Sequence, residues 1–256
     1  MAYFFSSCMP DPLQSLILFG VGALAGVINV MAGGGSTLTL PALIFLGLDG
    51  VTANGTNRVA IVVQDVFATL SFRREKVSRF RQSLLFAVCA LPGAVLGAVV
   101  AVRLSDAWFQ RILGILMVGI VISMLLPRSE AKGTTPEGIR SAWIYPALFG
   151  IGFYGGFIQV GVGFLFMAAF YHLLKMNLVY VNMHKALVIL LYTIPALAIF
   201  AWNGHVDWAL GLSLAAGNAL GGWWAARLAV RRGDRVIRYV LVVAVLIMAA
   251  KILGVF

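Results

Sequence analysis

The apolar positions of the chain fall into ten runs that are separated by short polar stretches. A helix that crosses a bilayer needs about 20 mostly apolar residues. Eight runs approach that length, whereas the runs at 36–48 and 163–175 would rise only about 20 Å as helices. The pattern predicts about eight full transmembrane helices plus two short broken or re-entrant helices, with runs at 13–32, 36–48, 53–72, 82–103, 108–127, 142–162, 163–175, 180–201, 208–229 and 237–255.

Composition places these runs in a membrane. Of the 256 residues, 61% are hydrophobic and 11% are charged, and the mean hydropathy is +0.97. An ordinary soluble domain is roughly 45–50% apolar and about 25% charged. We therefore expect an all-α polytopic membrane protein, in contact with the lipid bilayer and without a separate soluble domain.

The formal net charge of +10 is a topology signal rather than a sign of nucleic-acid binding. Most basic residues lie in three loops, at 73–81, 128–140 and 227–238, which the positive-inside rule places in the cytoplasm. The loops at 47–52 and 202–207 carry no Lys or Arg and are predicted to lie outside. With five elements in each half, both termini are expected outside.

The chain also repeats itself. Glycines and an amide side chain in 22–33 recur with the same spacing in 152–163, and three further blocks match in the same order. The basic loop at 73–81 corresponds to 203–207, which has no Lys or Arg, so equivalent loops should lie on opposite sides. This pattern predicts an inverted-topology duplicated repeat, with residues 1–127 as the first transmembrane repeat, 128–141 as a cytoplasmic linker and 142–256 as the second, inverted repeat.

A glycine-rich break separates the first two runs. Three consecutive glycines unwind a membrane helix, and bare backbone at that depth is tolerated where it packs in protein or lines a water-filled cavity. Free N–H groups and hydroxyls at the start of the next helix suit a small anion. The alternative is that glycines only permit close helix packing, as proposed for Gly93 and Gly97. The candidate substrate-binding residues are Gly33, Gly34, Gly35, Ser36 and Thr37.

Polar residues open the third run. Arg58 can complement an oxyanion, and polar groups at the head of an apolar helix are costly unless they are paired. They can also form an interfacial cap, with Arg58 extended to lipid headgroups. The candidates in this segment are Asn54, Thr56, Asn57 and Arg58.

The equivalent segment of the second half contains His184 and Lys185. Both segments should approach a midplane cavity, which would give an electropositive centre, although Lys185 can also serve as an anchor at the cytoplasmic end. Asp65 is expected to form an ion pair with Arg58 or Lys185, or to couple transport to protons; His184 is a second proton-coupling candidate.

Asn29 and Gln159 occupy matched positions before the two breaks, and Gly163 matches Gly33. The amides are candidate substrate ligands, or hydrogen bonds between helices. The two cysteines, Cys8 and Cys89, form no Cys-x-x-Cys pair. We find no metal-ligand spacing, catalytic triad, paired carboxylates or phosphate loop, so we expect no metal, no cofactor and no enzymatic activity.

The chain resembles the sulfite exporter TauE/SafE family over nearly its whole length. The resemblance rests on Gly26-x2-Asn29-x3-Gly33-Gly34-Gly35, Leu40-Pro41-Ala42-Leu43, Ala53-Asn54-Gly55-Thr56-Asn57 and Phe72-Arg73-Arg74. It implies a multi-pass bacterial inner-membrane transporter of sulfur-containing anions, with the family's motifs falling on Gly33–Gly35 and on Ala53, Thr56 and Asn57. The second half departs from the family pattern at Met183-His184-Lys185 and at Phe164-Leu165-Phe166, which suggests a reshaped pocket.

These observations favour a secondary transporter of small sulfur-containing oxyanions, of the sulfite or organosulfonate class, working by alternating access with proton coupling as an option. The alternatives are an anion channel, or a permease for another small anion or a metal cation. The expected partners are a small anionic substrate and the lipid bilayer, with no nucleic acid. A homo-oligomer stays open, because Gly-x3-Gly pairs can also serve an interface between protomers.

Overall fold

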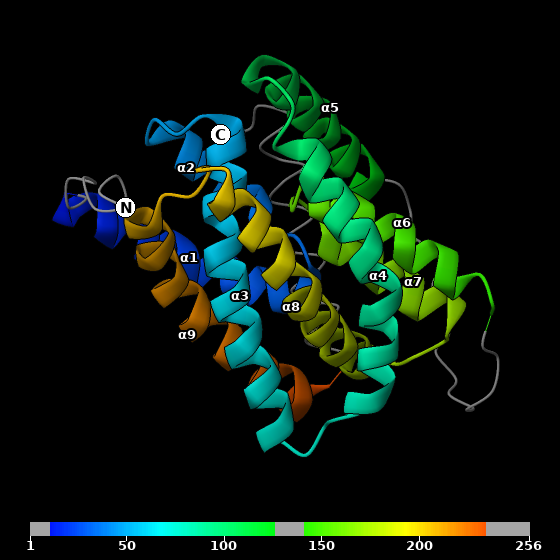
Figure 1. The fold of residues 1–256 in the computed structure, drawn as a ribbon. Coiled ribbons are helices and arrows are strands. Elements are labelled where there is room, and N and C mark those ends of the chain that lie inside the picture. Colours follow the sequence, from blue (N-terminus) through cyan, green and yellow to red (C-terminus); the bar gives the residue numbers. More distant parts are fainter. Residues whose placement is uncertain (1–10, 126–140, 234–256) are drawn as a thin grey trace.

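The computed structural model describes residues 11–125 and 141–233, with side chains up to residue 116 in the first range. Figure 1 shows that these residues form a helical bundle. The predicted tenth run at 237–255, the basic loop at 128–140 and most of the linker lie outside the described residues. The helices are α1 (Pro12–Ala32), α2 (Ser36–Phe45), α3 (Gly50–Arg74), α4 (Phe80–Ala101), α5 (Asp106–Leu125), α6 (Ile144–Phe157), α7 (Val162–Leu173), α8 (Leu178–Trp202) and α9 (Trp208–Arg232).

Each predicted run within the described residues contains one helix or most of it, which confirms the all-α prediction there. Side-chain caps explain several starts. Asp49 Oδ1 accepts a hydrogen bond from Thr52 N, so α3 begins three residues before its apolar run. Asn177 Oδ1 caps α8 in the same way, by accepting from Tyr180 N.

Long helices pair through small residues. On α1, a Cβ added to Gly22 would lie 2.5 Å from Leu214 O of α9. On α4, a Cβ added to Gly93 would lie 2.2 Å from Phe149 O of α6, and Gly97 meets Phe153 O in the same manner. The glycines thus let the backbones of α1 and α9, and of α4 and α6, approach closely. This outcome supports the packing interpretation of Gly93 and Gly97.

The centre of the bundle holds α3 and α8, which are antiparallel neighbours. Gly55, near the start of α3, contacts Phe200, near the end of α8. In Figure 1, α3 and α8 cross the bundle in opposite directions, and α4 and α9 also run oppositely. The two central helices carry most of the predicted site residues, so their packing decides which of these residues meet.

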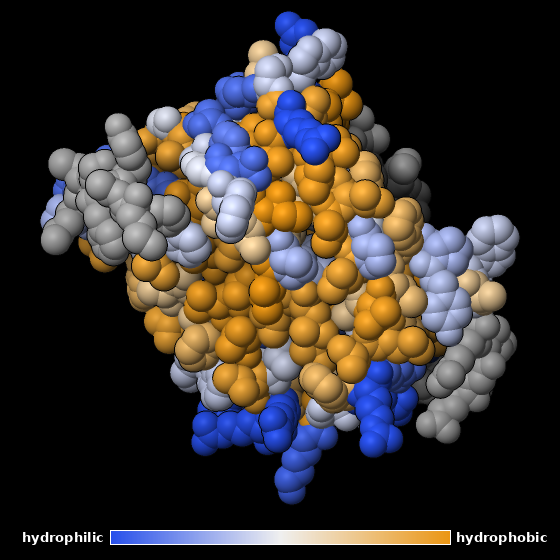
Figure 2. All heavy atoms as spheres, viewed as in Figure 1, coloured by the Kyte–Doolittle hydropathy of each residue, from blue (hydrophilic) through white to orange (hydrophobic). Residues whose placement is uncertain are grey.

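The surface is that of a protein in a bilayer. Figure 2 shows a broad apolar band between two hydrophilic ends. Within the described residues, α1, α4 and α8 are each long and apolar enough to cross a membrane. Trp143 and Trp202, which are 75% and 92% exposed, lie next to helix ends, where aromatic residues commonly sit at the lipid headgroups.

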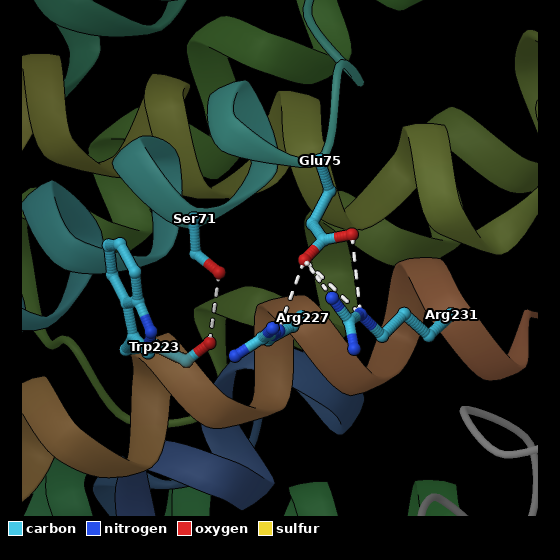
Figure 3. A network of polar contacts seen from close by, with 5 residues as sticks. All are labelled: Ser71, Glu75, Trp223, Arg227 and Arg231. Carbon is cyan, nitrogen blue, oxygen red and sulfur yellow. Dashed lines mark hydrogen bonds and ion pairs between the residues drawn. The ribbon is translucent and has the colours of Figure 1, made fainter.

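An ion-pair network joins α3 and α9 at one end of the bundle (Figure 3). Glu75 follows the last residue of α3 and lies 3.2 Å from both Arg227 Nε and Arg231 Nη2. Ser71 Oγ, one turn earlier, donates to Trp223 O of α9. The end of α3 is therefore tied to α9 by charge and by hydrogen bonding.

Candidate functional site

Two breaks in the helices lie at the centre of the structure. The first separates α1 from α2, where Gly33 has a φ of +87°, a conformation that favours glycine. The second separates α6 from α7, where Ile158 is extended and Gly161 has a φ of +70°. Because of this second break, α6 ends at Phe157 rather than at 162 as its apolar run predicted.

The breaks contact each other directly. A Cβ added to Gly163 would lie 2.4 Å from Gly33 Cα, so the two glycines touch backbone to backbone. Sequence analysis had matched these two glycines as equivalent positions of the halves. The substrate-site candidates of both breaks are thus brought together.

The start of α3 holds the second break. Asn54 Nδ2 donates to Phe157 O over 3.0 Å, and Asn54 Oδ1 accepts from Gln159 N over 3.2 Å. One turn further, Arg58 Nη2 donates to Gly156 O over 2.6 Å and Nη1 donates to Gln159 Oε1 over 3.1 Å. Arg58 is 0% exposed and therefore does not extend to the lipid headgroups.

The start of α8 holds the end of α1 in a corresponding way. Lys185 Nζ donates to Asn29 O over 2.9 Å and to Val30 O over 2.8 Å. Asn182 Nδ2 donates to Met31 O over 3.4 Å. Lys185 is 2% exposed, so it does not serve as an interfacial anchor in this structure.

Each cation meets the partial negative charge at a helix C-terminus. The last carbonyls of a helix lack intrahelical partners, and cations are favourable beside them. Arg58 thus stabilises the end of α6, and Lys185 stabilises the end of α1. Carbonyls are weaker partners for a buried cation than carboxylates, so an anion would compete well for both side chains.

Asn57 connects α3 to the start of α2. Its Oδ1 accepts from Thr39 Oγ1 over 2.6 Å, and its Nδ2 donates to Ser36 Oγ over 3.3 Å. Thr37 Oγ1 donates a hydrogen bond to Gly34 O, three residues earlier, over 2.6 Å. Sequence analysis missed Thr39, although it lies one helical turn from Ser36 and therefore shares its face of α2.

Asp65 lies deeper along α3 and is 3% exposed. Its Oδ1 accepts from Gln64 Nε2 over 3.1 Å, while Oδ2 has no hydrogen-bond partner. The expected ion pair with Arg58 or Lys185 is not formed among the described residues, where the acidic side chain that forms salt bridges is Glu75, with Arg227 and Arg231 of α9. Gln64 links Asp65 to the first break, because its Oε1 accepts from Asn29 Nδ2 over 3.2 Å.

Two predicted residues lie away from the breaks. Thr56 Oγ1 accepts from Asp207 N, which places it at the connection between α8 and α9. His184 Nδ1 lies 2.6 Å from Ser83 Oγ of α4, and its ring packs beside Phe86 and Phe170. These contacts make both residues part of helix packing in this structure.

Aromatic side chains also lie beside the breaks and the cations, and the sequence analysis did not include them among the site residues. The ring of Phe164 lies over Gly34, where an added Cβ would come within 2.5 Å of it. Phe200 lies under the guanidinium of Arg58, with 4.6 Å from Cζ to the ring centroid. Tyr192 lies on the same face of α8 as Lys185, two turns later, a spacing that could have indicated it. No group of three His, Cys, Asp or Glu side chains suited to a metal ion occurs in 11–125 or 141–233.

Comparisons with known proteins connect the chain to membrane transporters. The family model for the sulfite exporter TauE/SafE matches residues 18–252. The chain is 32% identical over 256 residues to a protein of Escherichia coli (strain K12) described as a probable membrane transporter protein YfcA; the match covers 99% of this chain and 94% of that protein.

Two further relatives carry similar descriptions. A probable membrane transporter protein of Haemophilus influenzae is 29% identical, with 92% of each chain covered, and one of Sinorhizobium, ORF9, is 28% identical, with 93% of this chain and 91% of that protein covered. No solved structure matches the chain. These descriptions indicate a membrane transport role rather than an enzymatic one, and the chain belongs to the sulfite exporter TauE/SafE family.

Proposed function

We propose that this protein is a secondary transporter that moves small sulfur-containing oxyanions, of the sulfite or organosulfonate class, across the bacterial inner membrane by alternating access. The observation that carries the proposal is the pair of buried cations, Arg58 and Lys185, whose hydrogen bonds go to backbone carbonyls and an amide oxygen at a break between helices. Charged side chains inside a membrane mark substrate paths by default.

The substrate site would lie between the two breaks. The Ser36 hydroxyl and the amides of Asn57 and Gln159 lie around them, and backbone N–H groups at the starts of α2 and α7 add partial positive charge. An oxyanion at this point would accept hydrogen bonds from these groups and draw Arg58 and Lys185 away from their carbonyls. Such a site suits a small anion far better than a metal cation.

We further propose that the two halves form an inverted repeat. Equivalent helices run in opposite directions, and Asp49 and Asn177 cap the equivalent helices α3 and α8. Left-handed backbone also recurs at matched positions, at Gly47 and Lys175 and again at Lys76 and Gly204. In transporters with this architecture, one half rocks against the other around a central site.

The buried state of the site favours a carrier over a channel. Ser36, Asn57, Arg58, Gln159 and Lys185 are between 0% and 3% exposed. A carrier passes through such an occluded state, whereas a conducting pore needs a continuous open path. Release of the anion then requires the contacts between the breaks to open on one side at a time.

Uptake into proteoliposomes tests the proposal. Radiolabelled sulfite, thiosulfate, sulfate and methanesulfonate would be offered to the native protein, to Arg58→Gln and to Lys185→Gln, with exposed Arg103→Gln as the matched control for loss of a positive charge. We expect saturable uptake of at least one anion that is lost in the two site variants, kept in the control and accelerated by unlabelled anion on the far side. Uptake without saturation or trans-stimulation would indicate a channel, and uptake unchanged in both site variants would refute the site.

A further inference from the structure

Asp65 is a buried carboxylate with no role in the transport site as proposed above. It lies two turns beyond Arg58 and on the same face of α3. A chain of hydrogen bonds connects it to the other cation: Gln64 donates to Asp65, Asn29 donates to Gln64, and Lys185 donates to Asn29 O. Asp65 is therefore linked to Lys185 by hydrogen bonds and shares a face of α3 with Arg58, without neutralising either cation in an ion pair.

The charges of these buried groups can be counted. In the described part of the chain, the buried Arg, Lys, Asp, Glu and His side chains of the bundle are Arg58, Asp65, His184 and Lys185. His184 is bonded to Ser83 and enclosed by two phenylalanine rings, a setting in which the neutral imidazole is favoured. Two cations and one carboxylate leave one net positive charge.

We propose that Asp65 sets the charge of the transported anion: the site accepts a monovalent anion, and it accepts a dianion only when Asp65 binds a proton. The inference rests on the proposed function and specifies the substrate class of the same site. A monovalent sulfonate would neutralise the net positive charge. A dianion beside an ionised Asp65 would leave a buried excess of one negative charge, which a low-dielectric site penalises strongly.

Proton uptake at Asp65 removes that penalty. The carboxylate becomes a carboxylic acid, and the proton travels with the dianion until both leave on the other side. The orphan Oδ2 atom is free to take the proton, because Oδ1 is occupied by Gln64. Lys185 and Tyr192 of α8 are the titratable groups that interact electrostatically with Asp65, while Arg227 and Arg231 of α9 meet Glu75 at the helix end.

The test compares two anions of similar size in the same proteoliposomes. Methanesulfonate carries one negative charge and sulfate carries two at about pH 6 and at about pH 8. For the native protein we expect methanesulfonate uptake that is flat across this range, and sulfate uptake that rises toward acid by up to about tenfold per pH unit, the limit for one required proton. At about pH 8, Asp65→Asn should raise the ratio of sulfate to methanesulfonate uptake by about tenfold or more, and its sulfate uptake should not depend on pH.

Asp65→Glu keeps the carboxylate and is the matched control, expected to keep the native ratio and pH profile. Should Asp65→Asn fail to fold, the native pH profiles alone decide: sulfate uptake that does not change with pH overturns the inference. An unaltered anion ratio in a folded Asp65→Asn variant overturns it as well. In both cases transport itself persists, whereas a native protein that moves none of the tested anions refutes the proposed function and this inference together.

Discussion

Gly33 and Gly163 touch at the centre of the molecule, with the backbone of one break packed against the backbone of the other. This contact joins residues from opposite halves of the chain, and it holds the end of α1 against the start of α7. A Cβ on either glycine would collide with the backbone of the other. The two breaks can therefore come this close only because both residues are glycine.

Gly163→Ala should disrupt the site. The new Cβ would lie 2.4 Å from Gly33 Cα, and backbone cannot yield as a flexible side chain can. We expect transport to be lost and the midpoint of thermal unfolding to fall, consistent with an overpacking cost of about 1–3 kcal/mol. Gly20→Ala and Gly150→Ala are the controls, because a Cβ at either position meets nothing within 4 Å; they should leave transport unchanged.

Phe164 should limit the size of the substrate. Its ring covers Gly34 and so takes up space beside the first break. We expect Phe164→Leu to raise uptake of larger organosulfonates relative to methanesulfonate, measured as a ratio in proteoliposomes. Phe19→Leu, on the exposed side of α1, is the control. The same ratio in both variants would show that Phe164 does not border the site.

Ser83→Ala should weaken the packing of α4 on α8. His184 would lose the hydrogen bond to its Nδ1, and its Nε2 already lacks a partner. Leaving a buried polar group unsatisfied costs about 1–3 kcal/mol, so the unfolding midpoint in detergent should fall. Ser78→Ala, at an exposed serine, should not change it. A Ser83→Ala midpoint equal to that of the native protein would contradict the assignment.

Glu75→Gln should have a smaller effect. The ion pairs with Arg227 and Arg231 are partly exposed, and exposed pairs contribute about 0.2–1 kcal/mol. We expect a slightly lower unfolding midpoint at low salt. The difference from the native protein should shrink as salt is added, because ions screen surface charges. A difference that grows with salt would argue against an electrostatic origin.

The helices and both breaks could be predicted from the sequence because their causes are local. Apolar runs set the helices, and the consecutive glycines set the break after Ala32. The end of α6 could not be placed, because the single polar residue Gln159 does not end an apolar run that continues to 162. It ends at Phe157, where Ile158 turns to extended backbone and Asn54 of α3 binds the freed groups.

The hydrogen-bond partners of the two cations could be identified only from the tertiary structure. Sequence analysis correctly grouped Arg58 and Lys185 near the two breaks, but their partners are carbonyls about a hundred or more positions away in the chain. Polarity alone does not distinguish a residue that faces the breaks from one that packs between helices. The contacts of Thr56 with Asp207 N and of His184 with Ser83 could therefore not be predicted from the sequence. Thr39 was missed for a similar reason, since its polar partner Asn57 comes from another helix.

Arg58 of the first half binds the end of α6 in the second half, and Lys185 of the second half binds the end of α1 in the first. This exchange has an evolutionary consequence. Each half supplies the side chain that completes the other, so a half on its own would leave a buried cation and several carbonyls without partners. Under the proposed duplication, the ancestral single unit would have needed a second copy of itself, inserted in the opposite orientation. Fusion of two such copies would then have made their mutual dependence permanent and freed Arg58, Asp65 and Lys185 to diverge from their equivalents.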